Sequence, residues 1–385
     1  MSSSPGVLYL VPYLTDPAVR RRLRMLRVGG AGPLTAAGFR RSADPVDEID
    51  GVPVLDLGRT EDGRLGRRLV SMAGARARTG WWGRRVQRPD VVLARSLEAL
   101  VLARAYRSRF APGAALVYES LDIHGLLLGD RLPSRALRAV EGRALRECSA
   151  LVTSSPGFVR EYFARHHAVV PPVVLAENKV LASETGPVPA LPPRPEGPPW
   201  TIGWFGLLRC PRSLSLLTGL CRRFPGRVRV EVRGRPAASL GADLAAAAAA
   251  TPGMTFHGPY DRATDLPRIY SEVQFSWTAD FSEAGANSDW LLPNRLYEAG
   301  PSGCVPIAPA GVETGRWLAA RDAGVRLPEP WERTLPEWLA GLTPEAYRAV
   351  RDRSLAVPLA DFVDDDAQAA DFVARISGAR AAPVR

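Results

Sequence analysis

One stretch of the chain combines an arginine and a glutamate at the start of a short helix. It reads Pro293-Asn294-Arg295-Leu296-Tyr297-Glu298-Ala299-Gly300, a loop followed by a helical turn and a glycine. A helix N-terminus offers free N–H groups to a phosphate, and Arg295 adds a charge-assisted contact. Glu298 lies one turn into the helix, where its two oxygens could accept both hydroxyls of a ribose. The alternative is that Glu298 only complements the dipole of the first turn.

A second stretch places two arginines after a glycine turn. It runs Gly203-Trp204-Phe205-Gly206-Leu207-Leu208-Arg209-Cys210-Pro211-Arg212, a strand that empties into a loop just before a helix. Gly206 lets the backbone approach a ligand closely. Two guanidinium groups, Arg209 and Arg212, suit the charges of a diphosphate. The alternative is a surface loop in an arginine-rich protein.

Polar residues also follow a strand in the first half of the chain, in Tyr118-Glu119-Ser120-Leu121-Asp122-Ile123-His124-Gly125. Asp122 and His124 fall where the strand ends, so either is a candidate general base for taking a proton from a hydroxyl. The alternative is that Asp122 caps the next segment and His124 is a satisfied loop residue.

A fold must position these residues, and the pattern of apolar runs along the sequence indicates which fold it is. Strand-like and helix-like segments alternate in both halves, which predicts an α/β fold with parallel, doubly wound sheets. Asp16-Pro17 predicts a helix start. In the first half the expected strands are 6–11, 52–57, 90–94, 115–119 and 150–153, and in the second half 201–205, 228–232, 254–257, 274–277 and 305–308.

A proline-rich run divides the two halves. Half of the residues in 186–199 are proline, which predicts an extended connector. We therefore expect an N-terminal Rossmann-like, acceptor-side domain at 1–185, a linker at 186–199, and a C-terminal Rossmann-like, nucleotide-sugar-binding domain at 200–343. In open parallel sheets ligands bind beyond the carboxyl ends of the strands, so a central cleft between the two domains is expected.

The two stretches that open this section resemble a known family. "NRLYEAGPSGCVPI" is similar to the C-terminal signature of GT-B glycosyltransferases, especially bacterial exopolysaccharide-type enzymes near glycosyltransferase family 4. "GWFGLLRCPRS" resembles the strand and loop that open the C-terminal domain of those enzymes, and "LVYESLDIHG" and "ECSALVTSSPGFVREYF" resemble segments of their N-terminal domain. The likeness covers most of the chain in order.

The resemblance implies a transferase that moves a sugar from a nucleotide diphosphate sugar to an acceptor hydroxyl. It places Arg209 and Arg212 on the donor diphosphate, Glu298 on the ribose, and Asn294, Arg295 and Tyr297 near the donor. It implies a hexosyltransferase-like, metal-independent enzyme of polysaccharide biosynthesis, whose acceptor is a bacterial surface or lipid-linked saccharide. It also implies C-terminal helices at 344–385 that cross back to the N-terminal domain.

Two loops are further candidates at such a site. Asp280–Asp289 follows a strand and is a candidate for contacting the donor sugar, with a plain surface loop as the alternative. Gly258, in His257-Gly258-Pro259-Tyr260, is a candidate beside the nucleobase, with a structural turn as the alternative.

One departure from the family pattern leaves alternatives open. Many family 4 enzymes carry two glutamates separated by seven residues, but Trp290 stands eight positions before Glu298. The retaining or inverting outcome is therefore undecided. A GT-B-like sugar epimerase and a non-catalytic GT-B-like binding or scaffold protein remain alternative functions.

Composition excludes several other classes. The net charge of +10 comes almost entirely from arginine, since Lys179 is the only lysine, and a compositional bias explains most of it. No zinc-finger or RNA-binding signature accompanies the charge, so no nucleic-acid partner is expected, and a polyanion-binding protein is a weak alternative. The four cysteines show no CxxC pair, so neither a metal site nor a disulfide scaffold is predicted, and no cofactor besides the donor substrate.

The sequence favours a cytoplasmic location. The N-terminal apolar run reads as a first strand rather than a signal peptide, and no apolar stretch reaches the ~20 residues needed to span a bilayer. Trp81 and Trp82 lie within the arginine-dense stretch 64–88, a pattern that suits peripheral contact with a membrane. The alternative is that both tryptophans pack beneath a loop.

Overall fold

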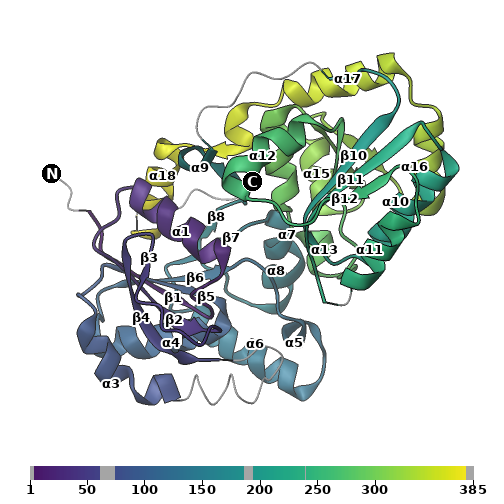
Figure 1. Ribbon diagram of the computed structural model, residues 1–385. Coiled ribbons are helices and arrows are strands. Elements are labelled where there is room, and N and C mark those ends of the chain that lie inside the picture. The colour runs from purple at the N-terminus through teal and green to yellow at the C-terminus, as the bar shows by residue number, and fades with distance from the viewer. Residues whose placement is uncertain (1–3, 61–73, 186–193, 239, 379–385) are drawn as a thin grey trace. The chain divides into compact units, whose positions relative to one another are not determined.

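The computed structural model describes residues 4–60, 74–185, 194–238 and 240–378. The chain forms two compact units: unit 1 is Met1–Glu177 together with Asp366–Arg385, and unit 2 is Asn178–Asp365. Each unit contains a parallel sheet with helices, as the alternating pattern predicts (Figure 1). The α/β class is therefore confirmed.

Unit 1 is built on an eight-stranded sheet in the order β3-β4-β2-β1-β5-β6-β7-β8. All neighbours are parallel except the short β3–β4 pair. The five strands expected in this half are confirmed, whereas β2, β3 and β8 are additions. The strands are β1 (Val7–Val11), β2 (Leu34–Arg40), β3 (Glu48–Ile49), β4 (Val52–Arg59), β5 (Val91–Arg95), β6 (Ala115–Ser120), β7 (Ala150–Thr153) and β8 (Val173–Leu175).

The first helix of unit 1 begins at the signal that the sequence shows. Helix α1 starts at Pro17, where the side chain of Asp16 accepts a hydrogen bond from the Ala18 N–H at 2.9 Å. The helices are α1 (Pro17–Val28), α3 (Thr79–Trp82), α4 (Ser96–Phe110), α5 (Gly125–Leu128), α6 (Leu132–Leu145), α7 (Pro156–Phe158), α8 (Ala164–His166) and α18 (Asp366–Ile376), with a π-helical turn at Val159–Phe163.

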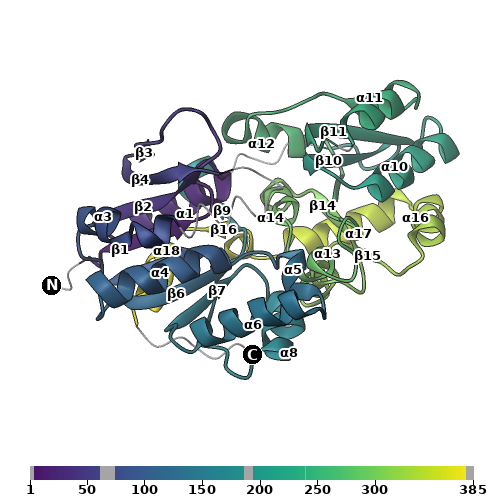
Figure 2. The ribbon, with the colours of Figure 1, turned by 90° about the horizontal axis from the view of Figure 1, so that it is seen from below.

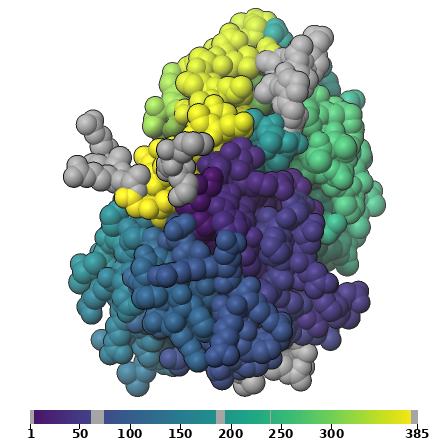
Figure 3. Space-filling model, turned by 90° about the vertical axis from the view of Figure 1, so that its left-hand side faces the viewer, coloured from purple at the N-terminus to yellow at the C-terminus, as the bar shows by residue number. Residues whose placement is uncertain are grey.

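The C-terminal helix α18 packs against α1 within unit 1, and Figure 3 shows the yellow C-terminal segment against the purple N-terminal one. The contact is close because the residue that follows α1, its C-cap, is Gly29. A β-carbon built there would lie only 2.3 Å from the Ala369 carbonyl oxygen. The guanidinium of Arg22 also lies 4.5 Å from the centre of the Phe372 ring. A small residue and a cation–π contact therefore fix this helix pair.

Unit 2 has a six-stranded, all-parallel sheet in the order β12-β11-β10-β13-β14-β15. The chain leaves β10 toward one edge of the sheet and returns to β13 on the other side, so the order reverses between these two strands. The five strands expected in this half are confirmed, and β15 is an addition. The strands are β10 (Trp200–Leu208), β11 (Val228–Pro236), β12 (Met254–Phe256), β13 (Phe275–Trp277), β14 (Val305–Pro309) and β15 (Val325–Leu327), with a separate pair of β9 (Val180–Leu181) and β16 (Val363–Asp364).

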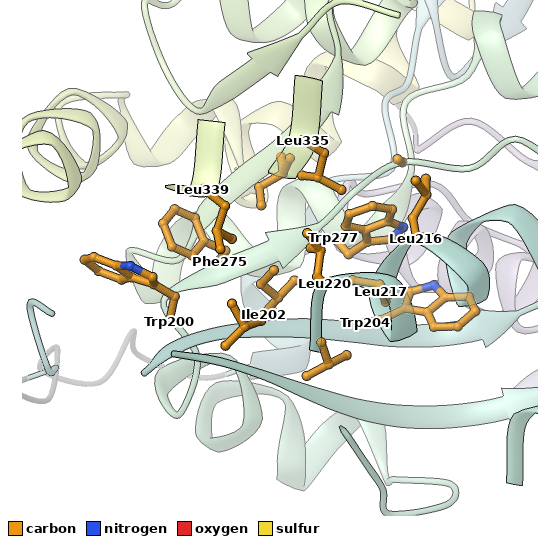
Figure 4. Packing of buried hydrophobic residues seen from close by; sticks show 14 of the residues in the cluster. Trp200, Ile202, Trp204, Leu216, Leu217, Leu220, Phe275, Trp277, Leu335 and Leu339 are labelled. Carbon is orange, nitrogen blue, oxygen red and sulfur yellow. The ribbon is translucent and has the colours of Figure 1, made fainter. Parts of the chain in front are cut away.

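Aromatic and aliphatic side chains together fill the core of unit 2 (Figure 4). The rings of Trp277 and Trp331 meet edge to face with their centres 5.2 Å apart, a favourable geometry for aromatic pairs. The helices around the sheet are α9 (Ala182–Thr185), α10 (Pro211–Arg223), α11 (Gly241–Ala249), α12 (Arg262–Ser271), α13 (Asn287–Trp290), α14 (Asn294–Ala299), α15 (Glu313–Ala319), α16 (Trp331–Ala340) and α17 (Pro344–Leu355) (Figure 2).

The borders of the units differ from the expected domain limits. Most of the proline-rich linker, 186–193, lies outside the described residues, and Arg194 is already docked on unit 2 through hydrogen bonds to the Tyr270 and Ser271 carbonyls. The segment 344–385 is divided between the units. Helix α17 belongs to unit 2, because the Tyr347 ring packs on Trp200 with centres 5.4 Å apart, whereas α18 belongs to unit 1.

The paired tryptophans have different environments. Trp82 is 1% exposed and stacks on Tyr106, and its indole N–H donates to the Ala75 carbonyl. Trp81 is 55% exposed, with the Arg85 guanidinium 3.9 Å from its ring centre. Trp82 is therefore a core residue, as the alternative of packed tryptophans has it, whereas Trp81 is exposed, and membrane contact of this region stays a prediction.

Candidate functional site

The strand order of unit 2 reverses between β10 and β13, and this is where ligands bind in open parallel sheets. Arg209 directly follows β10, and Asp280 lies just beyond β13. The Nε and one terminal nitrogen of Arg209 donate to the same Asp280 carboxylate oxygen at 3.1 and 2.9 Å. The pair therefore joins the two loops that flank the crevice.

Asp280 is held as a carboxylate. Burial alone would raise its pKa, but hydrogen bonds from Ser282 and the positive charge of Arg209 bring the pKa below its ordinary value. The Asp280 side chain is 6% exposed and that of Arg209 is 36% exposed. Within the described part of the chain, the second terminal nitrogen of Arg209 has no hydrogen-bond partner. Arg209 is thus oriented by Asp280 while keeping donors for a ligand.

Arg212 has a different environment from Arg209. Its guanidinium binds Glu329 at 2.7 Å and Glu332 at 2.9 Å, and it lies 4.4 Å from the Phe281 ring centre. Hydrogen bonds from Arg212 to Glu332 and Glu329 raise the pKa of the guanidinium. Two carboxylates already match its charge, so Arg212 fastens α10 to the residues that open α16.

The N-terminus of α10 is anchored beside the crevice. The Cys210 sulfur accepts hydrogen bonds from the N–H groups of Ser213 at 3.3 Å and Phe281 at 3.4 Å. The Trp277 indole donates to the Ser213 hydroxyl at 3.0 Å. These contacts come from both sides of the β10–β13 crevice, so the first turn of α10 is fixed relative to the loop after β13.

Gly206 bends β10 as it approaches this site. Its φ is +102°, which favours glycine, and no atom lies within 4 Å of a β-carbon built there. Its neighbour Gly234 on β11 has no such space, because a β-carbon there would lie 1.9 Å from the Gly206 carbonyl oxygen. Gly206 is therefore the open member of the pair.

The candidate residues of the stretch 293–300 lie on different faces of helix α14. Asn294 is exposed, and Arg295 donates to the Trp277 carbonyl at the end of β13 at 3.4 Å. Tyr297 is fully buried, with its ring centre 6.0 Å from that of Trp317. The position of Tyr297 on the helix points its side chain into the core, and its place beside the donor stays a prediction.

Glu298 lies in a polar cluster of unit 2. Its side chain is 4% exposed and accepts hydrogen bonds from Arg262 at 2.9 Å and the Tyr270 hydroxyl at 3.3 Å. Arg262 also pairs with Glu184 at 3.4 Å. Burial and the negative charge of Glu298 raise the pKa values of Tyr260 and Tyr270, so both hydroxyls stay protonated. The sequence carried no signal for Arg262 or Tyr270 as partners of Glu298.

Gly258 follows β12, and the structure does not bring it to Arg209 by any contact among the described residues. Its φ is +77° with open space around it, and its carbonyl accepts from the Gly234 N–H at 2.8 Å. Next to it, His257 binds Glu231 at 2.6 Å. The turn is tied to β11, while its open side leaves room for a ligand.

In unit 1, Asp122 and His124 follow β6. The His124 Nδ1 accepts the Leu126 N–H at 3.2 Å, which makes His124 the cap of α5. Asp122 is exposed, and its charge acts on Arg95 at the end of β5. Arg95 in turn binds Asp16, which follows β1, at 3.6 Å. Because β1 and β5 are the strands between which the order of this sheet reverses, these charges flank the equivalent crevice of unit 1.

Glu119 lies in the same region but is fully buried. It binds Arg22 at 2.7 Å and Arg95 at 3.1 Å and accepts from the Tyr9 hydroxyl. Burial would raise its pKa, but the two arginines and Tyr9 bring the pKa below its ordinary value. Glu119 therefore balances buried charge. Sequence reasoning missed this arginine pair, since its members are far apart along the chain.

Two negative findings apply to the described residues alone. Among them, no group of three or more histidine, cysteine, aspartate or glutamate side chains is arranged to hold a metal ion. In the same part of the chain, no helix has both the length and the apolar character needed to cross a bilayer.

Two α/β units, each built on a sheet whose strand order reverses, define a GT-B fold, and solved structures share this fold. HepE of Anabaena, solved with UDP, superposes with a TM-score of 0.69 at 14% identity over 96% of this chain and 98% of that one. WaaG, a glycosyltransferase of lipopolysaccharide biosynthesis, gives 0.63 at 13% identity over 95% and 99%.

One curated relative is close in sequence. The chain is 44% identical over 353 residues to the succinoglycan biosynthesis protein ExoL of Rhizobium meliloti, covering 90% of this chain and 87% of the relative. The chain belongs to the family of ExoL. No protein-family model matches the sequence.

Proposed function

We propose that this protein transfers a hexose from a nucleotide diphosphate sugar to a hydroxyl of a lipid-linked or growing bacterial exopolysaccharide. Two similarities support the proposal. The relative ExoL is named for succinoglycan biosynthesis, and the fold neighbour HepE has been solved with UDP-glucose. Neither similarity determines which sugar, which nucleobase or which acceptor this protein uses.

The observation that carries the proposal is the Arg209–Asp280 pair at the β10–β13 crevice. Arg209 keeps donors for a diphosphate, the first turn of α10 opens at the same place, and Arg295 contacts the end of β13. These fixed positive groups stabilise the charge that grows on the leaving diphosphate. The transfer therefore needs no metal ion. Arg212 is given a supporting role, because Glu329 and Glu332 match its charge.

We assign binding of the ribose to Glu298. Asn294, at the start of α14, is assigned a position near the phosphates. Glu298 is already oriented by Arg262 and Tyr270, and a carboxylate oxygen has more than one lone pair, so it can accept a ribose hydroxyl as well. Gly206 and Gly258 are the open glycines at which a nucleotide can approach the backbone.

On the acceptor side, Asp122 is the better candidate base. The His124 Nδ1 already accepts a backbone N–H, so the neutral ring carries its proton on Nε2. Such a ring donates a hydrogen bond and cannot take a proton at that nitrogen. Asp122 is exposed, and its charge interacts with that of Arg95. His124 then positions the acceptor while Asp122 takes its proton.

A panel of nucleotide sugars tests the proposal. The purified protein is incubated with each sugar nucleotide, with and without a bacterial glycolipid extract and with or without a chelator, and nucleotide diphosphate release is measured. We expect chelator-resistant release that rises when the acceptor extract is added. Isomerised sugar nucleotide without acceptor would indicate an epimerase. Binding without any turnover would indicate a scaffold protein.

A further inference from the structure

A cavity on unit 1 gathers an unusual amount of positive charge. It has a volume of about 510 Å³ and lies between α6 and the segment that follows α8. Four arginines and two histidines line it, with Ala139, Gly142, Ala168 and Val169 between them: Arg135, Arg138, Arg143, Arg146, His166 and His167. None of these residues belongs to the crevices described above.

The arginines reach the cavity because of their spacing on α6. The lining residues 135, 138, 139, 142, 143 and 146 recur at intervals of three and four, so they share one face of the helix. The small residues Ala139 and Gly142 leave a hollow between the longer side chains. A β-carbon built on Gly142 would lie 3.1 Å from the His167 Nδ1, so this histidine forms the opposite wall.

His167 is a fixed part of the wall. Its Nε2 binds Glu141 at 2.9 Å, and Glu141 also accepts hydrogen bonds from Tyr118 at 2.8 Å and Tyr162 at 2.5 Å. Burial and the charge of Glu141 raise the pKa values of both tyrosines, so they remain donors. Glu141 is fully buried and occupied by these three partners.

Little negative charge offsets the arginines. Arg138 donates to the Leu127 and Gly129 carbonyls, and its ion-pair partner Asp130 is 3.9 Å away and fully exposed. Within the described residues, Arg135, Arg143 and Arg146 have no ion pair. Partial burial and the charges of Arg138 and His167 lower the pKa of His166, which reflects the positive potential at this site.

We propose that this cavity binds a phosphate group carried by an anionic lipid. Arginine side chains and a histidine suit the oxygens of a phosphate ester. The apolar surroundings favour a lipid over a free phosphate. Leu132 is 80% exposed, Val169 47% and Val140 37%, and the first and last lie on the exposed face of α6. A helix face of arginine and apolar residues is typical of contact with a lipid surface.

Histidine resonances report occupancy of the cavity directly, because the chain contains only four histidines. The full-length protein is labelled at histidine, and the pKa of His166 is measured by NMR with increasing inorganic phosphate. We expect a saturable rise of the His166 pKa, because a bound anion stabilises its charged form. Arg143→Gln with Arg146→Gln should weaken this binding about tenfold or more.

Two variants separate the cavity from general electrostatics. Ala139→Leu fills the cavity without changing charge and should abolish the pKa rise. Arg227→Gln with Arg229→Gln removes the same charge from exposed positions of unit 2 and should leave it unchanged. If the His166 pKa does not respond to phosphate, or responds equally in the Ala139→Leu variant, the cavity is not a phosphate site.

Vesicles identify the source of the phosphate. Co-sedimentation is measured with phosphatidylcholine vesicles, with and without phosphatidylglycerol. A lipid site predicts binding only to the anionic vesicles, and less binding for Ala139→Leu than for the unmodified protein. Phosphate binding without any vesicle binding would overturn the lipid assignment. The lipid assignment would also be overturned if vesicle binding were lost in Trp81→Ala and unchanged in Ala139→Leu. That result would place the membrane contact at the exposed Trp81.

Discussion

Arg209 and Asp280 are 71 positions apart in the chain, yet their side chains pair at 2.9 Å. They follow the two strands of unit 2 between which the strand order reverses. Unit 1 has a similar pair at the same topological place, where Asp16 after β1 binds Arg95 at the end of β5 at 3.6 Å. In each unit an acid and an arginine therefore join the loops that flank the ligand-binding crevice of an open sheet.

Replacing Arg209 should weaken donor binding. Charge-assisted hydrogen bonds are worth roughly 1.5–3 kcal/mol, so Arg209→Gln should raise the Kd for the nucleotide diphosphate about ten- to a hundredfold. The matched control is Arg212→Gln, whose charge is already paired with Glu329 and Glu332. Calorimetric titration compares the two. Equal losses in both variants would show that the arginines act together on the ligand.

Glu298 should matter for the ribose and not for the phosphates. Glu298→Gln is expected to weaken nucleotide diphosphate binding by about tenfold or more, and to leave binding of inorganic pyrophosphate unchanged. Arg262→Gln is the control for the orientation of Glu298. It removes the arginine that donates to Glu298 at 2.9 Å and keeps the Glu298 carboxylate. Equal losses for the nucleotide and for pyrophosphate would contradict the ribose assignment.

Asp280 should stabilise unit 2 in a pH-dependent way. Its folded-state pKa lies below the unfolded value of ~3.9, so its contribution is present above about pH 4 and lost as the pH falls through the folded pKa. Asp280→Asn should therefore cost about 1–3 kcal/mol at neutral pH and much less at strongly acidic pH. Urea unfolding at both pH values checks this, with the exposed Asp243→Asn as control. A cost that does not change with pH would show that charge is not the cause.

The contact between α1 and α18 depends on Gly29. In Gly29→Ala the new methyl group would meet the Ala369 carbonyl at 2.3 Å, so α18 must shift, at a cost of about 1–3 kcal/mol. Hydrogen exchange in α18 should accelerate. Gly219→Ala is the matched control, because Gly219 lies in α10 with open space around it and should gain up to about 1 kcal/mol. Unchanged exchange in α18 would show that the helix pair tolerates the methyl group.

Local signals predicted much of the fold. Asp16-Pro17 marks the start of α1 because a capping side chain and a proline act within a few residues. By contrast, β2 (Leu34–Arg40) was missed, since its sequence LTAAGFR is rich in small residues and lacks the apolar run that marks a buried strand. The structure places it in the sheet beside β1, so its neighbours determine its conformation.

The site was predictable only in part, because partners arise from strand adjacency. Arg209 is visible as an arginine after a glycine turn, but its partner Asp280 follows from the pairing of β10 with β13. The carboxylates that hold Arg212 are 117 and 120 positions away, and nothing in its local sequence indicates them. Glu298 likewise has partners 36 and 28 positions away. Residue types identify candidates, and topology decides what each one contacts.

Hydrogen exchange with bound nucleotide tests the site assignment most directly. Exchange of backbone amides is followed by mass spectrometry with and without UDP, GDP and ADP in turn. We predict that at least one nucleotide slows exchange in two segments. These are 206–213, with the loop after β10 and the first turn of α10, and 294–298, which is most of α14. Protection confined to the β1–β5 crevice of unit 1, with these two segments unchanged, would contradict this prediction.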